Sequence, residues 1–88
     1  MYEISGYSYK KARKLNVEIF SATNPAKKID VYKDGYKVAT IGDIDYYDYP
    51  SYLKLYGKDV ANEHKRLYHI RHKNDTGLAG YYSKELLW

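Results

Sequence analysis

Tyrosine is the residue that most constrains how this chain can fold, because it supplies 13 of the 88 residues. Phe, Trp and Met occur only once each. A phenol ring can be buried, but its hydroxyl then needs a hydrogen-bond partner or access to water. A chain of this length also buries only about 60–65% of the surface that its unfolded form exposes. We therefore expect one small domain with a modest core.

The charge is mildly basic, with 15 Lys and Arg against 11 Asp and Glu and a net charge of +4. Its distribution is uneven, since residues 1–40 and 58–88 are net basic while residues 41–57 are acidic and rich in tyrosine. Two basic segments thus flank an acidic one. The pattern fits an ordinary solvated surface, and it also fits a face that binds a polyanion.

The chain contains no cysteine, which excludes disulfides, thiolate metal sites and a cysteine nucleophile. No apolar run approaches the ~20 residues that cross a bilayer, so we expect no membrane partner. The first residues lack the charged and apolar segments of a secretory signal. We expect an intracellular protein that is not secreted.

Three short segments alternate polar and apolar residues as half-buried strands do: residues 16–20, 28–32 and 36–41. Asp34 and Gly35 separate the last two and are typical of a tight hairpin turn, because Gly adopts positive φ without strain. In the second segment Ile29 and Val31 share one face. The sequence therefore predicts a small antiparallel sheet of two or three strands.

Two helices are expected after the sheet. Pro50 suits the first turn of a short helix, Asp48 lies just before it near the positive end of the helix dipole, and Gly57 ends it. Asp59 is expected to cap a second, longer helix that runs to about His72.

The two ends of the chain are expected to differ. Residues 1–15 are polar and basic, and we interpret them as a tyrosine-containing N-terminal arm that a partner would order. Residues 16–88 are expected to form a single α+β domain, with one longer and one shorter helix packed on the sheet. A C-terminal segment is expected to close its core, through Leu86, Leu87 and Trp88.

Candidate catalytic and metal-binding patterns are incomplete. His69 and His72 have a spacing that lets them meet on a helix, but the HExxH motif is absent and only Glu63 or Asp75 is conceivable as a third ligand. A nucleophile elbow and a Gly-rich phosphate loop are absent as well. We predict no metal, no cofactor and no enzymatic activity.

Basic residues interleaved with tyrosines are the remaining functional signal. Lys and Arg contact phosphates, and tyrosine rings stack on unpaired bases at ~1–3 kcal/mol each. Tyr68, Tyr81 and Tyr82 are instead expected in the core. The predicted nucleic-acid-binding residues are Lys10, Lys11, Arg13 and Lys14 near the N-terminus, and Lys65, Arg66, His69 and Lys73 on one side of the longer helix.

A second set of residues is predicted to be structural. Arg71 shares a helix side with Val60 and Leu67, so it is expected to pair with a carboxylate of the acidic segment, namely Asp43, Asp45 or Asp48. The complete predicted set is Gly35, Asp48, Tyr68, Arg71, Gly80, Leu86, Leu87 and Trp88.

Residues 28–88 contain a distinctive series of motifs: a hairpin that ends in Gly, an Asp-Tyr pair, an Arg-His helix and an Ala-Gly-aromatic-aromatic…Leu-Leu-Trp tail. The positions that carry it are Gly42, Asp48, Tyr49, Arg66, Tyr68, Arg71, His72, Ala79, Gly80, Tyr81, Tyr82, Leu86, Leu87 and Trp88. In this pattern the chain resembles an uncharacterised family of small basic proteins from large DNA viruses and tailed phages. The resemblance covers roughly residues 28–88, and residues 1–15 match no part of it.

The resemblance implies a viral or phage origin and a place in the host-cell cytoplasm or the virion, but no activity. Three functions remain open. The first is a non-enzymatic accessory protein that binds nucleic acid, and the second is a small virion component that binds capsid or other viral structural proteins. The third is an inhibitor of a host defence enzyme.

Overall fold

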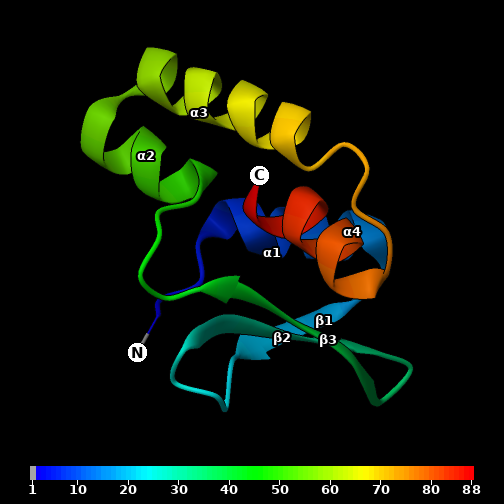
Figure 1. The fold of residues 1–88 in the computed structure, drawn as a ribbon. Coiled ribbons are helices and arrows are strands. Elements are labelled where there is room, and N and C mark those ends of the chain that lie inside the picture. Colours follow the sequence, from blue (N-terminus) through cyan, green and yellow to red (C-terminus); the bar gives the residue numbers. More distant parts are fainter. Residues whose placement is uncertain (1) are drawn as a thin grey trace.

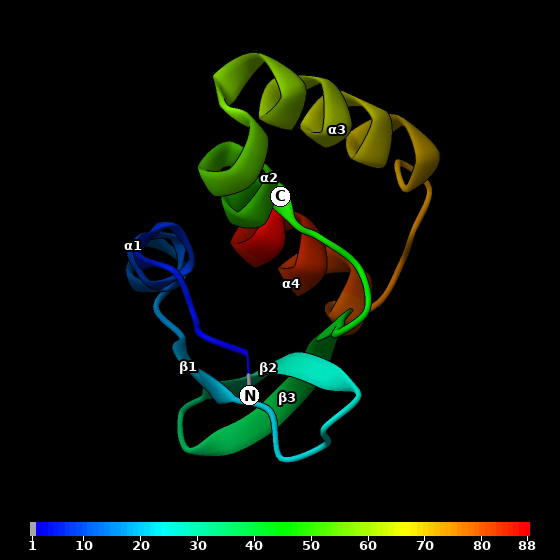
Figure 2. The ribbon, with the colours of Figure 1, turned by 90° about the vertical axis from the view of Figure 1, so that its left-hand side faces the viewer.

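The computed structural model describes residues 2–88 and stacks three layers (Figure 1). An antiparallel sheet with strand order β1-β2-β3 forms the first layer. Helices α1 and α4 cover one face of the sheet, and helices α2 and α3 form a hairpin beyond them, as the turned view also shows (Figure 2). The strands are β1 (Glu18–Ser21), β2 (Lys27–Lys33) and β3 (Tyr36–Asp43). The helices are α1 (Gly6–Leu15), α2 (Tyr49–Tyr56), α3 (Lys58–Arg71) and α4 (Leu78–Leu87).

The predicted α+β class and the hairpin turn are confirmed. Asp34 and Gly35 link β2 to β3 with φ values of 52° and 84°, which is the left-handed pair of a tight hairpin. Gly35 is therefore structural, as expected.

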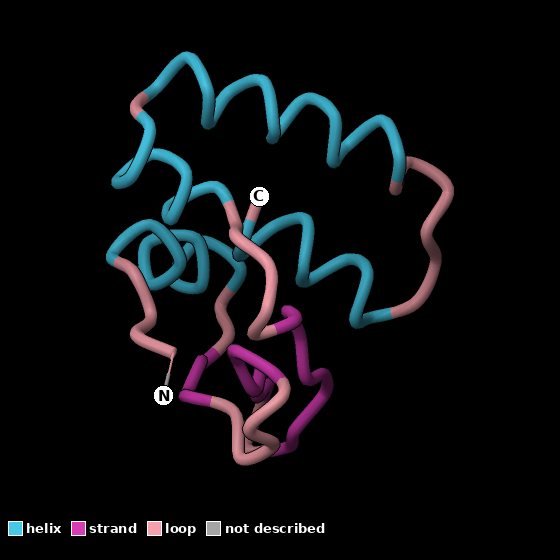
Figure 3. The backbone as a smooth tube through the Cα atoms, turned by 60° about the vertical axis from the view of Figure 1, so that its left-hand side comes forward, coloured by secondary structure: helices cyan, strands magenta, loops and turns pink. Residues whose placement is uncertain are grey.

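The hydrophobic core lies between the sheet and α4. Ile29 and Val31 of β2 are fully buried on the face that the alternation predicted. Leu86 and Leu87 of α4 pack against that face and are also buried. The end of the chain at Trp88 reaches the middle of the molecule, between the helical hairpin and the other helices (Figure 3). The prediction that the C-terminal segment closes the core is confirmed.

The prediction of an irregular N-terminal arm is wrong, because helix α1 occupies most of it. Ser5 caps the helix by accepting a hydrogen bond from the Ser8 backbone N–H, and Ser8 and Ala12 are buried. The Ser8 hydroxyl donates to the Leu86 carbonyl oxygen at 2.6 Å. The fully buried residues of α1 are thus small, so the sequence shows no large aliphatic side chain at these positions to mark a helix that faces a core.

The remaining helices differ from the prediction at the start of α3 and in the presence of α4. The α2 helix ends at Gly57 as expected, but Gly57 rather than Asp59 is the N-cap of α3. The segment after Gly77 was predicted to be buried, without a helix, yet it forms α4. Of the residues in α3, only Ala61 is fully buried. The helical hairpin therefore contributes little to the aliphatic core.

Candidate nucleic-acid interface

Helices α1 and α3 meet at a pair of tyrosine rings. Tyr7 of α1 packs on Tyr49 at the start of α2, with 5.1 Å between ring centroids. The Lys65 ammonium of α3 lies 4.9 Å from the Tyr49 centroid and 6.0 Å from that of Tyr7. The Lys11 ammonium of α1 lies 5.2 Å from the Tyr7 centroid. Cations from both sequence-predicted basic groups therefore contact the same aromatic pair.

Hydrogen bonds fix the two rings in place. The Tyr7 hydroxyl donates to the Trp88 carbonyl oxygen at 3.0 Å, and the Tyr49 hydroxyl donates to the Asn62 side-chain oxygen at 2.9 Å. Burial raises the pKa of Tyr7, although the nearby Lys65 charge opposes the rise. The Tyr7 phenol thus stays protonated near neutral pH and keeps its donor role.

One flank of α3 carries cations and no acidic residue. Positions 58, 62, 65 and 69 are three or four residues apart and so lie on one side of the helix; they hold Lys58, Asn62, Lys65 and His69. The acidic residues Asp59 and Glu63 fall outside this flank. Because Lys65 contacts Tyr7, the flank is the side of α3 that faces α1.

Helix α1 completes the surface. It has no acidic residue, and its cations Lys10, Arg13 and Lys14 are exposed while Lys11 is half-buried against Tyr7. The negative charge of Glu85 in α4 contributes to the raised pKa of Tyr7. We call these seven residues the basic surface: Lys10, Lys11, Arg13, Lys14, Lys58, Lys65 and His69.

Two predicted binding residues lie apart from the basic surface. Arg66 forms two hydrogen bonds with the Glu63 carboxylate, so its charge is locally compensated. Lys73 lies in the exposed turn after α3. Sequence reasoning missed Lys58, because it started the helix at Asp59. It also missed Tyr49, whose role depends on a contact with α1 that no local pattern reveals.

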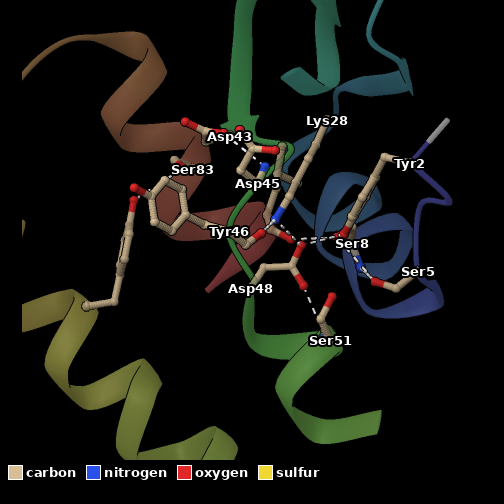
Figure 4. Close-up of polar contacts among 12 residues, drawn as sticks. Tyr2, Ser5, Ser8, Lys28, Asp43, Asp45, Tyr46, Asp48, Ser51 and Ser83 are labelled. Carbon is tan, nitrogen blue, oxygen red and sulfur yellow. Dashed lines mark hydrogen bonds and ion pairs between the residues drawn. The ribbon is translucent and has the colours of Figure 1, made fainter. Parts of the chain in front are cut away.

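Asp48 does more than stabilise the start of α2, the role that the sequence predicts for it. Its carboxylate accepts the Ser51 backbone N–H at 3.0 Å, the Tyr2 hydroxyl at 2.6 Å and the Lys28 ammonium at 3.0 Å (Figure 4). Asp48 and Lys28 are both buried. This cluster joins the N-terminal segment, the sheet and the start of the helical hairpin.

The protonation states of the cluster follow from its contacts. Burial raises the pKa of Asp48, but the Tyr2 hydrogen bond and the Lys28 charge outweigh it, so the net pKa lies below its usual value. Burial and the Asp48 carboxylate both raise the pKa of Tyr2. Tyr2 therefore remains a donor and Asp48 an ionised acceptor.

The predicted pairing of Arg71 is wrong. Arg71 is exposed at the end of α3, and within residues 2–88 it forms no ion pair with Asp43, Asp45 or Asp48. Lys28 takes the place that was expected for Arg71, because strand β2 brings it directly beneath the acidic segment. Sequence reasoning considered only the helix as a source of the cation.

Stacked aromatic rings attach the helical hairpin to α4. The Tyr68 ring of α3 stacks on Trp88 at 4.6 Å between centroids and on His72 at 4.2 Å. Its hydroxyl donates to Ser83 of α4 at 3.2 Å. Tyr52 of α2 stacks on His64 at 3.9 Å. Tyr68 and Trp88 are therefore structural, as predicted.

These rings line a groove of about 460 Å³ between α3 and the β3–α4 side of the molecule. Two histidines line the groove. His64 stacks on Tyr52, and His72 stacks on Tyr68 and forms a hydrogen bond with the Asp75 carboxylate. Within the described residues, no group of three or more His, Asp and Glu is placed to hold a metal ion. The groove thus lies beside the aromatic contacts between the layers, and Lys28, Asp43 and Arg71 also line it.

The two remaining tyrosines that were expected in the core differ in burial. Tyr82 is buried as expected, but Tyr81 is 46% exposed, so its assignment to the core is wrong. Gly80 lies in α4, where an added Cβ would approach the Asp75 Cβ to 3.2 Å. This close approach gives Gly80 a packing role.

Comparisons with family models, curated proteins and solved structures found no match to this chain. Among the described helices, none is long and apolar enough to cross a membrane. The viral family resemblance stays a prediction.

Proposed function

We propose that this protein binds nucleic acid through the basic surface, as a non-enzymatic accessory protein. The observation that carries the proposal is the convergence of Lys11 and Lys65 on Tyr7. It brings two basic groups that lie about fifty residues apart in the chain onto one surface. The family resemblance adds a prediction of viral or phage origin, which the binding proposal does not need.

Charge and geometry support phosphate contacts rather than base reading. Six Lys or Arg side chains of the basic surface come from two helices with their acidic residues placed elsewhere or absent. Neutralised phosphates release counterions, which drives association without sequence preference. Tyr7 and Tyr49 already pack on each other, so they position the lysines instead of stacking on bases.

A paired charge reversal tests the proposal. The test variant carries Lys14→Glu and Lys65→Glu, on the two helices of the basic surface. The control variant carries Lys33→Glu and Lys54→Glu, which change the net charge equally at exposed sites on β2 and α2. Binding to single- and double-stranded oligonucleotides is measured by fluorescence anisotropy over a series of salt concentrations.

The test variant should lose about 1 kcal/mol or more per phosphate contact at low salt, and its salt slope on duplex should fall by about 2. The control variant should bind nearly as the wild type does. The proposal fails if the wild type binds neither oligonucleotide at low salt, or if both variants lose affinity equally.

Exposed apolar residues on the helical hairpin favour a second candidate function, binding to a protein such as a viral structural component. Leu55 and Ile70 are both more than half exposed, and Leu53, Val60 and Leu67 are also exposed. Surfaces of this kind are enriched at protein interfaces. An apolar interface keeps its affinity at high salt, whereas phosphate binding does not, so the salt series separates the two candidates.

A further inference from the structure

Strand β1 leaves one edge of the sheet open. Among the described residues, 2–88, it pairs only with β2, and the Ala22 N–H bonds to the Lys28 carbonyl oxygen just beyond the strand. In an antiparallel pair the bonded residues alternate, so Phe20 and Glu18 also bond inward. The backbone groups of Ile19 and Ser21 therefore point away from β2, and within residues 2–88 they have no other hydrogen-bond partner.

Two hollows flank this edge on opposite faces of the sheet. The outer hollow has a volume of about 440 Å³ and is lined by the Phe20 and Tyr32 rings, which pack edge to face at 5.5 Å. The inner hollow has a volume of about 230 Å³ and lies between β1 and α1, against Tyr9, Ala12 and Arg13. Side chains of an added strand would point alternately into the two hollows.

The two hollows differ in chemistry. In the inner one, Arg13 is exposed and has no carboxylate partner among the described residues. In the outer one, the Phe20 and Tyr32 rings supply an apolar wall, the exposed Glu18 lies at its rim, and the buried Asp30 carboxylate is already bound by Thr40 and Thr23. An acidic side chain thus fits the inner hollow, and a large apolar one fits the outer hollow.

We propose that the β1 edge binds an extended peptide segment of a partner protein by strand addition, and that the segment alternates acidic and large apolar residues. Main-chain hydrogen bonds to Ile19 and Ser21 supply affinity, and the two hollows supply specificity. This inference shares only Arg13 with the basic surface, and it does not rest on nucleic-acid binding.

A second copy of this chain is a poorer occupant. Pairing two β1 strands antiparallel would relate the copies by a two-fold axis perpendicular to the sheet, which places both α1 helices on the same face. Figure 2 shows α1 directly above β1. The exposed cations of the two helices would then oppose each other across the axis: Lys10, Arg13 and Lys14 of each copy.

The test uses one acetylated and amidated peptide, Tyr-Asp-Val-Asp-Tyr-Thr, titrated into the ¹⁵N-labelled full chain. Binding should shift the backbone amides of Ile19 and Ser21. Two N-methylated forms of the peptide give the decisive control, because alternate amides of an added strand face the edge. Methylation of one alternate set should abolish binding, while methylation of the other set should leave it intact.

Charge-reversal variants test whether the inner hollow binds an acidic side chain. Arg13→Glu should weaken binding of the acidic peptide about tenfold, and the matched Lys54→Glu variant, with the same change in net charge, should not. The proposal is overturned if the peptide at millimolar concentration shifts no β1 amide, or if both methylated forms bind alike. Concentration-dependent shifts at β1 without peptide would overturn it in favour of self-association.

Discussion

The body of the molecule and its helical hairpin are built in different ways. The body, consisting of the sheet with α1 and α4, holds a continuous aliphatic core around Ile29, Val31 and Leu86. The hairpin of α2 and α3 buries only Ala61 completely and leaves several leucines exposed. It is attached to the body by aromatic stacking and by the Asp48 cluster.

Aliphatic residues and tyrosines have different structural roles in this chain. The few aliphatic residues make the core of the body, where full burial is worth about 1.5–3 kcal/mol per side chain. Tyrosines join the layers, since an aromatic pair adds about 0.5–1.5 kcal/mol and keeps its hydroxyl hydrogen-bonded. A tyrosine-rich chain can therefore be stable in one region and more easily opened in another.

The largest expected effect lies in the body. Leu86→Ala removes a fully buried side chain and should lower the free energy of unfolding by about 2–5 kcal/mol. Leu67→Ala is the matched change on the hairpin, where the residue is 36% exposed, and should cost less than about 0.5 kcal/mol. Urea denaturation measures both. Equal losses of unfolding free energy in the two variants would contradict the proposed difference between the body and the hairpin.

The Asp48 cluster predicts a smaller, pH-dependent effect. The pKa of Asp48 is lowered in the folded state by Tyr2 and Lys28 against the effect of burial, and that of Asp30 is lowered by Thr40, Thr23 and Lys37 against the same effect. Their contributions are therefore complete above the unfolded pKa of about 3.9 and are lost as pH falls through the folded values. Thermal unfolding should show stability declining below about pH 5.

Asp48→Asn sharpens this prediction. The variant should be less stable than the wild type at neutral pH, because the buried Lys28 charge loses its carboxylate partner and keeps only the Tyr46 carbonyl oxygen. It should also lose less stability on acidification, since the Asp48 contribution is gone while that of Asp30 remains. If the stability of the two proteins declines in parallel as the pH falls, Asp48 does not link the layers.

Local patterns predicted the sheet and the paired helices because their signals are local. Alternation placed Ile29 and Val31 correctly, Asp34-Gly35 specified the turn, and Pro50 placed α2. Helix α1 escaped prediction because its buried residues are Ser8 and Ala12, which hydropathy does not distinguish from a surface. Its fit depends on the Leu86 carbonyl at the other end of the chain.

The candidate site was predicted in its composition but not in its assembly. The basic residues of α1 and α3 are visible in the sequence, and the structure places Lys11 and Lys65 on one aromatic pair. The Lys28–Asp48 pair and the Arg66–Glu63 pair decide which charges remain free. Such pairings depend on the tertiary arrangement or on the exact helix register, so spacing alone assigned Arg71 to the wrong role.

Native-state hydrogen exchange tests the central claim, that the hairpin is a separately opening layer on a stable body, most directly. Amides of Leu67 and Tyr68 in α3 should exchange through an opening at least about 2 kcal/mol below that of Ile29 and Val31 in β2, with a weaker dependence on denaturant. Exchange of all four amides with one opening free energy, equal to that of global unfolding, would contradict the account.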